Sequence, residues 1–136
     1  VQTCALPIWP TKFGAFLDST LDRYGDVFLY IGLYIGGYAE KLIIVIALIG
    51  AFLTSYTRSR VEGLGIESMG GIGILERTDR VPLLMFGTII ENLVPGVLYW
   101  VIIALLVGSH FTAFQRIVFA HKNLSKSSES KSEDNE

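Results

Sequence analysis

Four apolar runs with few or no charged residues dominate the sequence and limit the folds that it can adopt. They cover residues 27–38, 42–54, 81–90 and 94–107, and 51% of the chain is hydrophobic. A bilayer crossing needs roughly 20 mostly apolar residues, so each run is long enough only if its helix extends into semi-polar flanks. We therefore predict an all-α, polytopic membrane protein with about four transmembrane helices. The alternative is a compact soluble helical bundle, and the near absence of charge inside the runs argues against it.

The two ends of the chain differ in composition from its apolar centre. Residues 1–10 begin with Val, contain no basic residue and resemble a translated sequencing adapter, so we expect a non-native leader and not a signal peptide. Residues 123–136 are rich in Ser, Glu and Lys, which predicts a disordered tail. The membrane domain then covers residues 11–122. A single cysteine, Cys4, excludes a disulfide framework within the chain.

Glycine and proline positions divide the membrane domain into four expected helices, at about 12–36, 39–64, 76–92 and 95–119. A Gly-rich loop at residues 67–74 separates the second helix from the third. Most basic residues lie at one end of these helices, and the cytoplasmic side of a membrane protein carries the excess of Lys and Arg. This places the basic end, the tail and the aspartates of the first helix in the cytoplasm.

Three aspartates follow one another at four-residue intervals in the first helix. Asp18, Asp22 and Asp26 therefore share one helical face, where like charges destabilise the helix unless arginines or a metal neutralise them. Hard divalent cations prefer carboxylate oxygens, and the sequence has no cysteine pair or spaced histidine pair for zinc or copper. Gly14 lies on the same face, where it allows either a large ligand or a neighbouring helix to come close.

Five arginines come from the other three helices at the same predicted membrane depth: Arg58, Arg60, Arg77, Arg80 and Arg116. A guanidinium group binds phosphate through a rigid, bidentate fork. Any one of these arginines could instead form a salt bridge or contact a lipid headgroup. Together, a carboxylate site beside a phosphate-binding set at a membrane surface indicates phosphoryl transfer on a lipid.

The segment GAFLDSTLD has the pattern G-x3-D-x3-D, formed by Gly14, Asp18 and Asp22. It resembles the second half of the signature of the CDP-alcohol phosphatidyltransferase family. The segments SYTRSRVEGLG, GILERTDR and FQRI are similar to those of its inositol phosphate branch, the archaetidylinositol phosphate and phosphatidylinositol phosphate synthases. The first half of the signature, D-x2-D-G-x2-A-R, does not occur in this chain. We therefore expect an N-terminally truncated fragment, the C-terminal part of the family's membrane domain.

The resemblance implies roles for individual residues. Asp18 and Asp22 would be metal ligands, and Asp22 would also act as the general base. Gly14 would lie beneath the cytidine nucleotide. The inositol phosphate site would consist of Ser55, Arg58, Arg80 and Arg116, with Arg60 and Arg77 as supports. Asp26 falls outside the signature, and we expect it to have a structural role or to pair with a nearby arginine.

The resemblance also implies partners: a CDP-linked lipid, a polyol phosphate, membrane lipids and two Mg²⁺ (or Mn²⁺) ions in the full-length protein. It further implies a homodimer with no nucleic-acid partner. Without the upstream aspartates, we expect this fragment alone to be inactive. Two alternative functions stay open, namely the same chemistry with another acceptor such as glycerol 3-phosphate, and a non-catalytic membrane module that binds or conducts ions.

Overall fold

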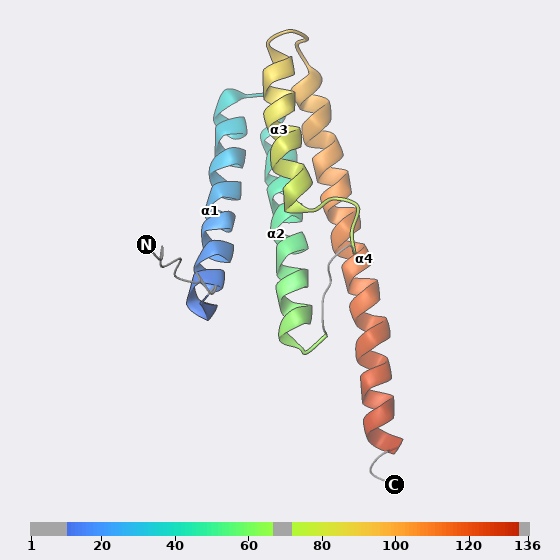
Figure 1. Cartoon of the computed structure of the whole chain (residues 1–136). Helices are drawn as coiled ribbons and strands as arrows, with labels where there is room; N and C mark the ends of the chain where they lie inside the picture. Colours follow the sequence, from blue (N-terminus) through green and yellow to red (C-terminus); the bar gives the residue numbers. More distant parts are fainter. Residues whose placement is uncertain (1–10, 67–71, 134–136) are drawn as a thin grey trace, which may run out of the picture.

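The computed structural model describes residues 11–66 and 72–133, and these form four helices that alternate in direction along the chain (Figure 1). The helices are α1 (Lys12–Gly36), α2 (Lys41–Gly63), α3 (Arg77–Glu91) and α4 (Val97–Glu133). The predicted all-α architecture with four helices is confirmed. The predicted leader at residues 1–10 and most of the predicted Gly-rich loop lie outside the described residues.

Local signals in the sequence explain where the first three helices begin and end. The Thr11 side chain caps α1 by accepting a hydrogen bond from the Gly14 N–H. Gly37 ends the helix with φ at 70°, a left-handed conformation that glycine adopts without steric cost. Glu76 and Asp79 form a capping box at the start of α3. These bounds agree with the predicted helices to within two residues.

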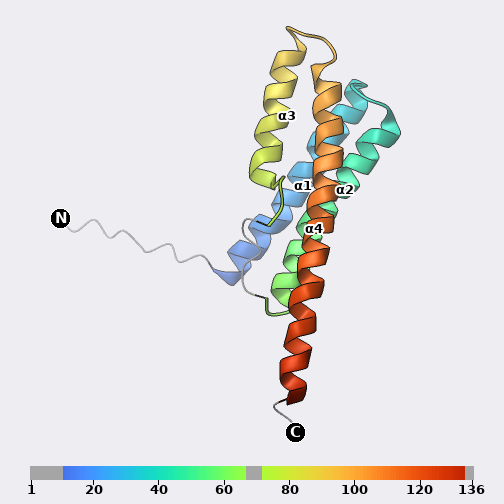
Figure 2. The same ribbon diagram turned by 90° about the vertical axis from the view of Figure 1, so that its right-hand side faces the viewer.

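The fourth helix is longer than predicted. The sequence predicted its end near Phe119 and a disordered tail at 123–136, but α4 continues to Glu133 and extends well past the other helices (Figures 1 and 2). No proline or glycine follows Gly108 in this helix, so the backbone meets no residue that would end it. Residues 134–136 lie outside the described part of the chain.

Small residues let α2 and α4 approach closely. Ala47 and Ala51 are fully buried in the core, and Gly50 lies on the same face. A Cβ atom added at Gly50 would lie 2.6 Å from Nδ1 of His110, so a side chain there would force the helices apart. Such small-residue faces are typical of helices packed in membranes.

Helix α4 also packs against α3, and α1 packs on the far side of α2. The core between the helices consists of Tyr30, Leu33, Ile44, Ala47, Ala51, Leu84, Leu98, Ile102 and Leu105.

Two of the four helices are long and apolar enough to cross a membrane: α2, and α4 over Val97–Ser125. Helix α1 has sufficient length, but Asp18, Asp22 and Arg23 make its first half polar. Helix α3 has 15 residues, which at about 1.5 Å per residue is shorter than the hydrocarbon core. Membrane association is therefore supported by α2 and α4, and for α1 and α3 spanning stays a prediction.

Candidate active site

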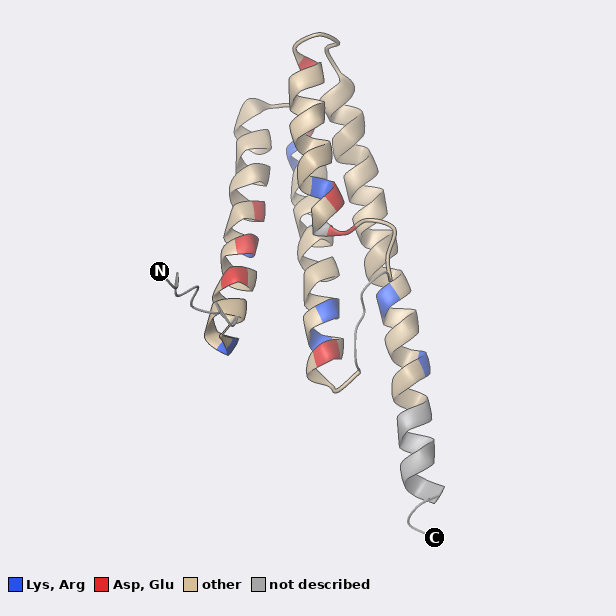
Figure 3. Cartoon of the chain, viewed as in Figure 1, with Lys and Arg blue, Asp and Glu red and all other residues tan. Residues whose placement is uncertain are grey.

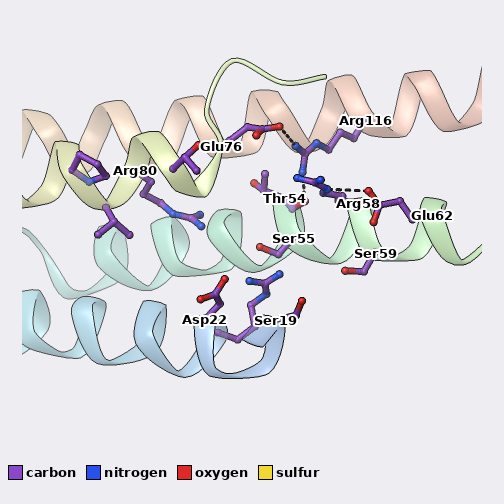
Figure 4. A pocket seen from close by; sticks show the side chains of 14 residues that line it. Ser19, Asp22, Thr54, Ser55, Arg58, Ser59, Glu62, Glu76, Arg80 and Arg116 are labelled. Atoms are coloured by element: carbon purple, nitrogen blue, oxygen red, sulfur yellow. Dashed lines mark hydrogen bonds and ion pairs between the residues drawn. The ribbon is translucent and has the colours of Figure 1, made fainter. Parts of the chain in front are cut away.

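A cavity of about 470 Å³ lies between the helices and receives side chains from all four of them (Figure 4). Except for Val81 and Pro82, the residues that line it carry a charged group or a hydroxyl, in contrast to the apolar core. In Figure 4, Asp22 points into the cavity from α1, Ser55 and Arg58 from α2, and Arg80 from α3. Arg116 reaches the cavity from α4. The helices thus bring together five of the residues that the sequence predicted for the site.

The aspartates of α1 do not have equivalent surroundings. Asp18 is exposed and does not line the cavity, whereas Asp22 is half-buried and does. Asp26, one turn further along, is 1% exposed and lies beneath the cavity lining. The row therefore runs from solvent through the cavity wall into the interior.

Arg58 is the arginine most open to a ligand. Its Nε atom donates to the Glu62 carboxylate at 3.0 Å, an ion pair one turn apart on α2, and the Arg58 side chain is 45% exposed. A guanidinium group carries five N–H donors. This bond uses one donor, so the terminal nitrogens can turn toward a ligand in the cavity without breaking it.

Arg80 is fixed by a buried ion pair. Its Nη2 atom donates to Oδ2 of Asp26 at 3.1 Å, and each side chain is 2% exposed. The sequence predicted that Asp26 pairs with an arginine or is structural, and the pairing is confirmed. Because Arg80 also lines the cavity, the pair connects the carboxylate-bearing helix α1 with the wall contributed by α3.

Arg116 holds three parts of the chain together around the cavity. Its Nη1 atom donates to the Thr54 carbonyl at 2.6 Å, its Nε atom to the Ile72 carbonyl at 2.8 Å, and its Nη2 atom to the Glu76 carboxylate at 3.1 Å. These acceptors belong to α2, to the loop before α3 and to the cap of α3. Arg116 therefore fixes the α2–α3 connection against α4, and only part of its fork remains for a ligand.

Three of the described residues that the sequence predicted for the site, Gly14, Asp18 and Arg60, do not line the cavity. Gly14 lies near the start of α1, two turns before Asp22, and its N–H donates to Thr11 Oγ1 at 2.9 Å. Asp18 and Arg60 are exposed and are not among the lining residues. Arg77 begins α3, but its side chain lies outside the described part of the structure.

Sequence reasoning missed several residues of the cavity wall: Ser19, Arg23, Thr54, Ser59, Glu62, Glu76, Thr78, Val81 and Pro82. The spacing of Glu62, four residues after Arg58, was a signal for an ion pair on one helical face. The acidic residue before the third helix indicated a cap at Glu76. The hydroxyl residues carry no comparable signal, because Ser and Thr occur on many helix surfaces.

The donor chemistry of α1 suits a hard divalent cation. Asp18 and Asp22 offer carboxylate oxygens one turn apart on one face, and Mg²⁺ commonly takes one or two carboxylates together with phosphate oxygens. Among the residues that the structure describes, no group of three or more His, Cys, Asp or Glu side chains gathers to hold a metal ion. The pair thus fits part of a cation site.

Comparisons with known proteins bear on the identity of this site. The chain is 39% identical over 116 residues to the archaetidylinositol phosphate synthase of Methanothermobacter thermautotrophicus, covering 85% of this chain and 58% of that protein. It is 35% identical to the archaetidylinositol phosphate synthase of Pyrococcus horikoshii, covering 84% of this chain and 57% of that protein. The phosphatidylinositol phosphate synthase of Mycolicibacterium smegmatis is 32% identical over 79% of this chain and 52% of its own length.

The chain spans little more than half the length of these relatives, and no family model matches it. The matched region nevertheless includes most of the chain. The chain is therefore homologous over most of its length to archaetidylinositol phosphate and phosphatidylinositol phosphate synthases, consistent with the CDP-alcohol phosphatidyltransferase family that its motifs resemble.

Proposed function

We propose that the full-length protein is a membrane phosphatidyltransferase of phospholipid biosynthesis. It transfers a phosphatidyl or archaetidyl group from a CDP-linked lipid to an inositol phosphate and releases CMP. The observation that supports this proposal best is the convergence of Asp22, Ser55, Arg58, Arg80 and Arg116 on one cavity. The names of the homologous proteins support the inositol phosphate acceptor.

The reaction requires a base, a phosphate-binding site and neutralisation of the pyrophosphate. In the proposed step, the acceptor hydroxyl oxygen bonds to the phosphorus next to the lipid as the bond to the CMP oxygen breaks. Asp22 takes the hydroxyl proton, since it is the aspartate that lines the cavity. Asp18 and Asp22 would hold a divalent cation, which when bound would neutralise charge on the pyrophosphate. CMP leaves with the bonding electrons.

The arginines would select an acceptor that carries its own phosphate group. Arg58 is half-exposed and offers both terminal nitrogens, whereas Arg80 and Arg116 are held rigidly by Asp26 and Glu76. A preformed guanidinium loses less side-chain entropy when it binds phosphate. We propose that Arg58 closes on the phosphate while Arg80 and Arg116 form the fixed wall, with Ser55 as a hydroxyl donor.

An assay of the full-length protein with alternative acceptors tests this function. Purified protein receives CDP-archaeol or CDP-diacylglycerol, Mg²⁺, and either an inositol phosphate, glycerol 3-phosphate or no acceptor. We expect CMP and a new phospholipid with the inositol phosphate. We expect neither product from the 136-residue chain alone. Product with glycerol 3-phosphate and none with inositol phosphate would show that the acceptor has been assigned incorrectly.

Two substitutions separate an enzyme from a non-catalytic membrane module. Asp22→Asn removes the proposed base and should reduce CMP release at least 100-fold, in line with the usual contribution of about 10²–10⁴ from general acid–base catalysis. Glu40→Gln changes a carboxylate before α2, away from the cavity, and should leave the rate unchanged. Equal rates in wild type and Asp22→Asn would contradict the proposed role, and ion binding without CMP release would favour the module.

A further inference from the structure

The Asp26–Arg80 pair is unusual because both charged side chains are buried. The bond joins α1 to α3 across the interior at 3.1 Å, between two helices that otherwise make few close contacts. Taking two charges out of water is costly, and well-packed apolar residues would often be at least as stable at such a position. A buried pair is therefore weak evidence for a purely stabilising role, and its position suggests another.

The pair lies directly beneath the cavity. Arg80 lines the wall, whereas Asp26 does not, so Asp26 can affect a ligand only through a neighbour that touches it. Asp26 also follows Asp22 by one helical turn, on the face that supplies the cavity carboxylate. The ion pair thus joins Arg80 of the cavity wall to the helix that carries Asp22.

Two buried polar atoms lie on the residues in and next to the pair. Tyr30 lies one turn after Asp26 and is 1% exposed, and its hydroxyl has no hydrogen-bond partner among the described residues. The Nε atom of Arg80 is likewise buried without a partner in the described part of the chain. The Asp26 carboxylate thus anchors one terminal nitrogen of a guanidinium whose residue also lines the cavity.

We propose that Asp26 is a positioning residue that presets the Arg80 guanidinium for the phosphate of the acceptor. This inference rests on the proposed function, since it assigns a phosphate ligand to the cavity. Asp26 touches neither substrate. Its removal should weaken phosphate binding because Arg80 would have to be ordered during binding, and should leave recognition of the CDP-lipid unchanged.

Steady-state kinetics of Asp26→Asn in the full-length protein provide the first test. We expect the KM for the inositol phosphate to rise about tenfold, while the KM for the CDP-lipid stays within twofold of wild type. Asp26→Glu retains the carboxylate and should recover part of the loss. In an Arg80→Gln background, Asp26→Asn should raise the KM for the inositol phosphate little further, since its proposed effect on this KM acts through Arg80. Equal losses in both backgrounds would overturn the proposal.

Leu33→Ala provides the control for simple loss of stability. Leu33 is buried in α1 two turns after Asp26 and does not line the cavity, so its truncation should lower the unfolding temperature without changing the KM for the inositol phosphate. If Leu33→Ala raises this KM as much as Asp26→Asn does, Asp26 is structural and the positioning role is wrong.

A binding experiment keeps the inference independent of the overall reaction. The unfolding temperatures of wild type and Asp26→Asn in detergent are measured at increasing concentrations of inorganic phosphate or of an inositol phosphate. We expect wild type to be stabilised and Asp26→Asn to need about tenfold more ligand for the same shift. If phosphate stabilises wild type more than Asp26→Asn but no CMP is released in the assay, the proposed function is wrong and the positioning role of Asp26 stands. No shift in wild type, or equal affinities in both proteins, would overturn the inference.

Discussion

Arg116 illustrates how one side chain can serve both the fold and the site. Arg116 is 2% exposed as a residue. Its guanidinium donates hydrogen bonds to acceptors in α2, in the α2–α3 loop and in the cap of α3. A resemblance between sequences assigns this arginine to a ligand, but it does not reveal that internal acceptors already use three of its donors. A ligand that binds Arg116 would have to share the guanidinium N–H groups that already hold the helices together.

Replacing Arg116 by lysine should therefore destabilise the protein even though the charge is kept. A single ammonium cannot reach three separated acceptors, and buried acceptors left without a donor cost about 1–3 kcal/mol. We expect a lower unfolding temperature in detergent for Arg116→Lys. The control is Arg60→Lys on the exposed surface of α2, which should change little. Similar unfolding temperatures for both variants would mean that the three bonds do not contribute to stability.

The part of the site that was predictable follows from spacing and residue type. Asp22 belongs to the G-x3-D-x3-D motif, and Arg58, Arg80 and Arg116 come from the other helices at the same predicted depth. Their convergence could therefore be expected from the sequence. The pairing of Asp26 was foreseen only in general terms, because four-residue spacing shows that a charge needs a partner but does not identify Arg80. Such a partner is set by how α1 and α3 pack, which depends on contacts between residues 54 positions apart.

At the level of helices, the apolar runs and the glycine and proline positions were sufficient for α1, α2 and α3. They were insufficient for the end of α4, because a polar composition does not distinguish a solvated helix from a disordered tail. The turn between α3 and α4 depends instead on one carboxylate. Glu91 ends α3 and accepts hydrogen bonds from the N–H groups of Gly96 at 2.8 Å and Leu98 at 2.7 Å.

Glu91 makes this turn sensitive to acid. The hydrogen bonds from Gly96 and Leu98 favour the ionised carboxylate and hold the pKa of Glu91 below its ordinary value. A carboxyl group with a lowered pKa stabilises the folded state above its unfolded pKa of about 4.3, and this contribution is lost as the pH falls through the lower folded pKa. The turn should thus be fully stabilised at neutral pH.

Glu91→Gln should lower the unfolding temperature at pH 7, and the difference from wild type should shrink as the pH is reduced below about 4. Thermal unfolding of both proteins across this range measures the effect. Glu40→Gln serves as the control because the Glu40 side chain makes no capping hydrogen bond. A difference between wild type and Glu91→Gln that is constant with pH would contradict an ionised cap at this turn.

Across the whole molecule, charge is distributed unevenly along the helix axes. Most of the coloured charged positions lie in the half of the bundle that contains the cavity (Figure 3). At the other end, Lys41 begins α2 and Glu91 ends α3. An excess of Lys and Arg marks the cytoplasmic side of membrane proteins. By this rule the cavity is expected to open toward the cytoplasm, where soluble phosphorylated acceptors would reach it, and this orientation stays a prediction.

This orientation can be tested by labelling single cysteines in a background in which Cys4 is replaced by Ser. Gly63→Cys lies at the cavity end of α2, where a side chain meets open space, and Leu93→Cys lies in the α3–α4 turn, where the leucine is 79% exposed. In intact cells, a membrane-impermeant maleimide should label Leu93→Cys, whereas Gly63→Cys should react only after permeabilisation. The Cys4→Ser parent should stay unlabelled in both conditions, which controls for background. The reverse labelling pattern would put the cavity on the outer face, and labelling of both positions in intact cells would rule out a membrane between them.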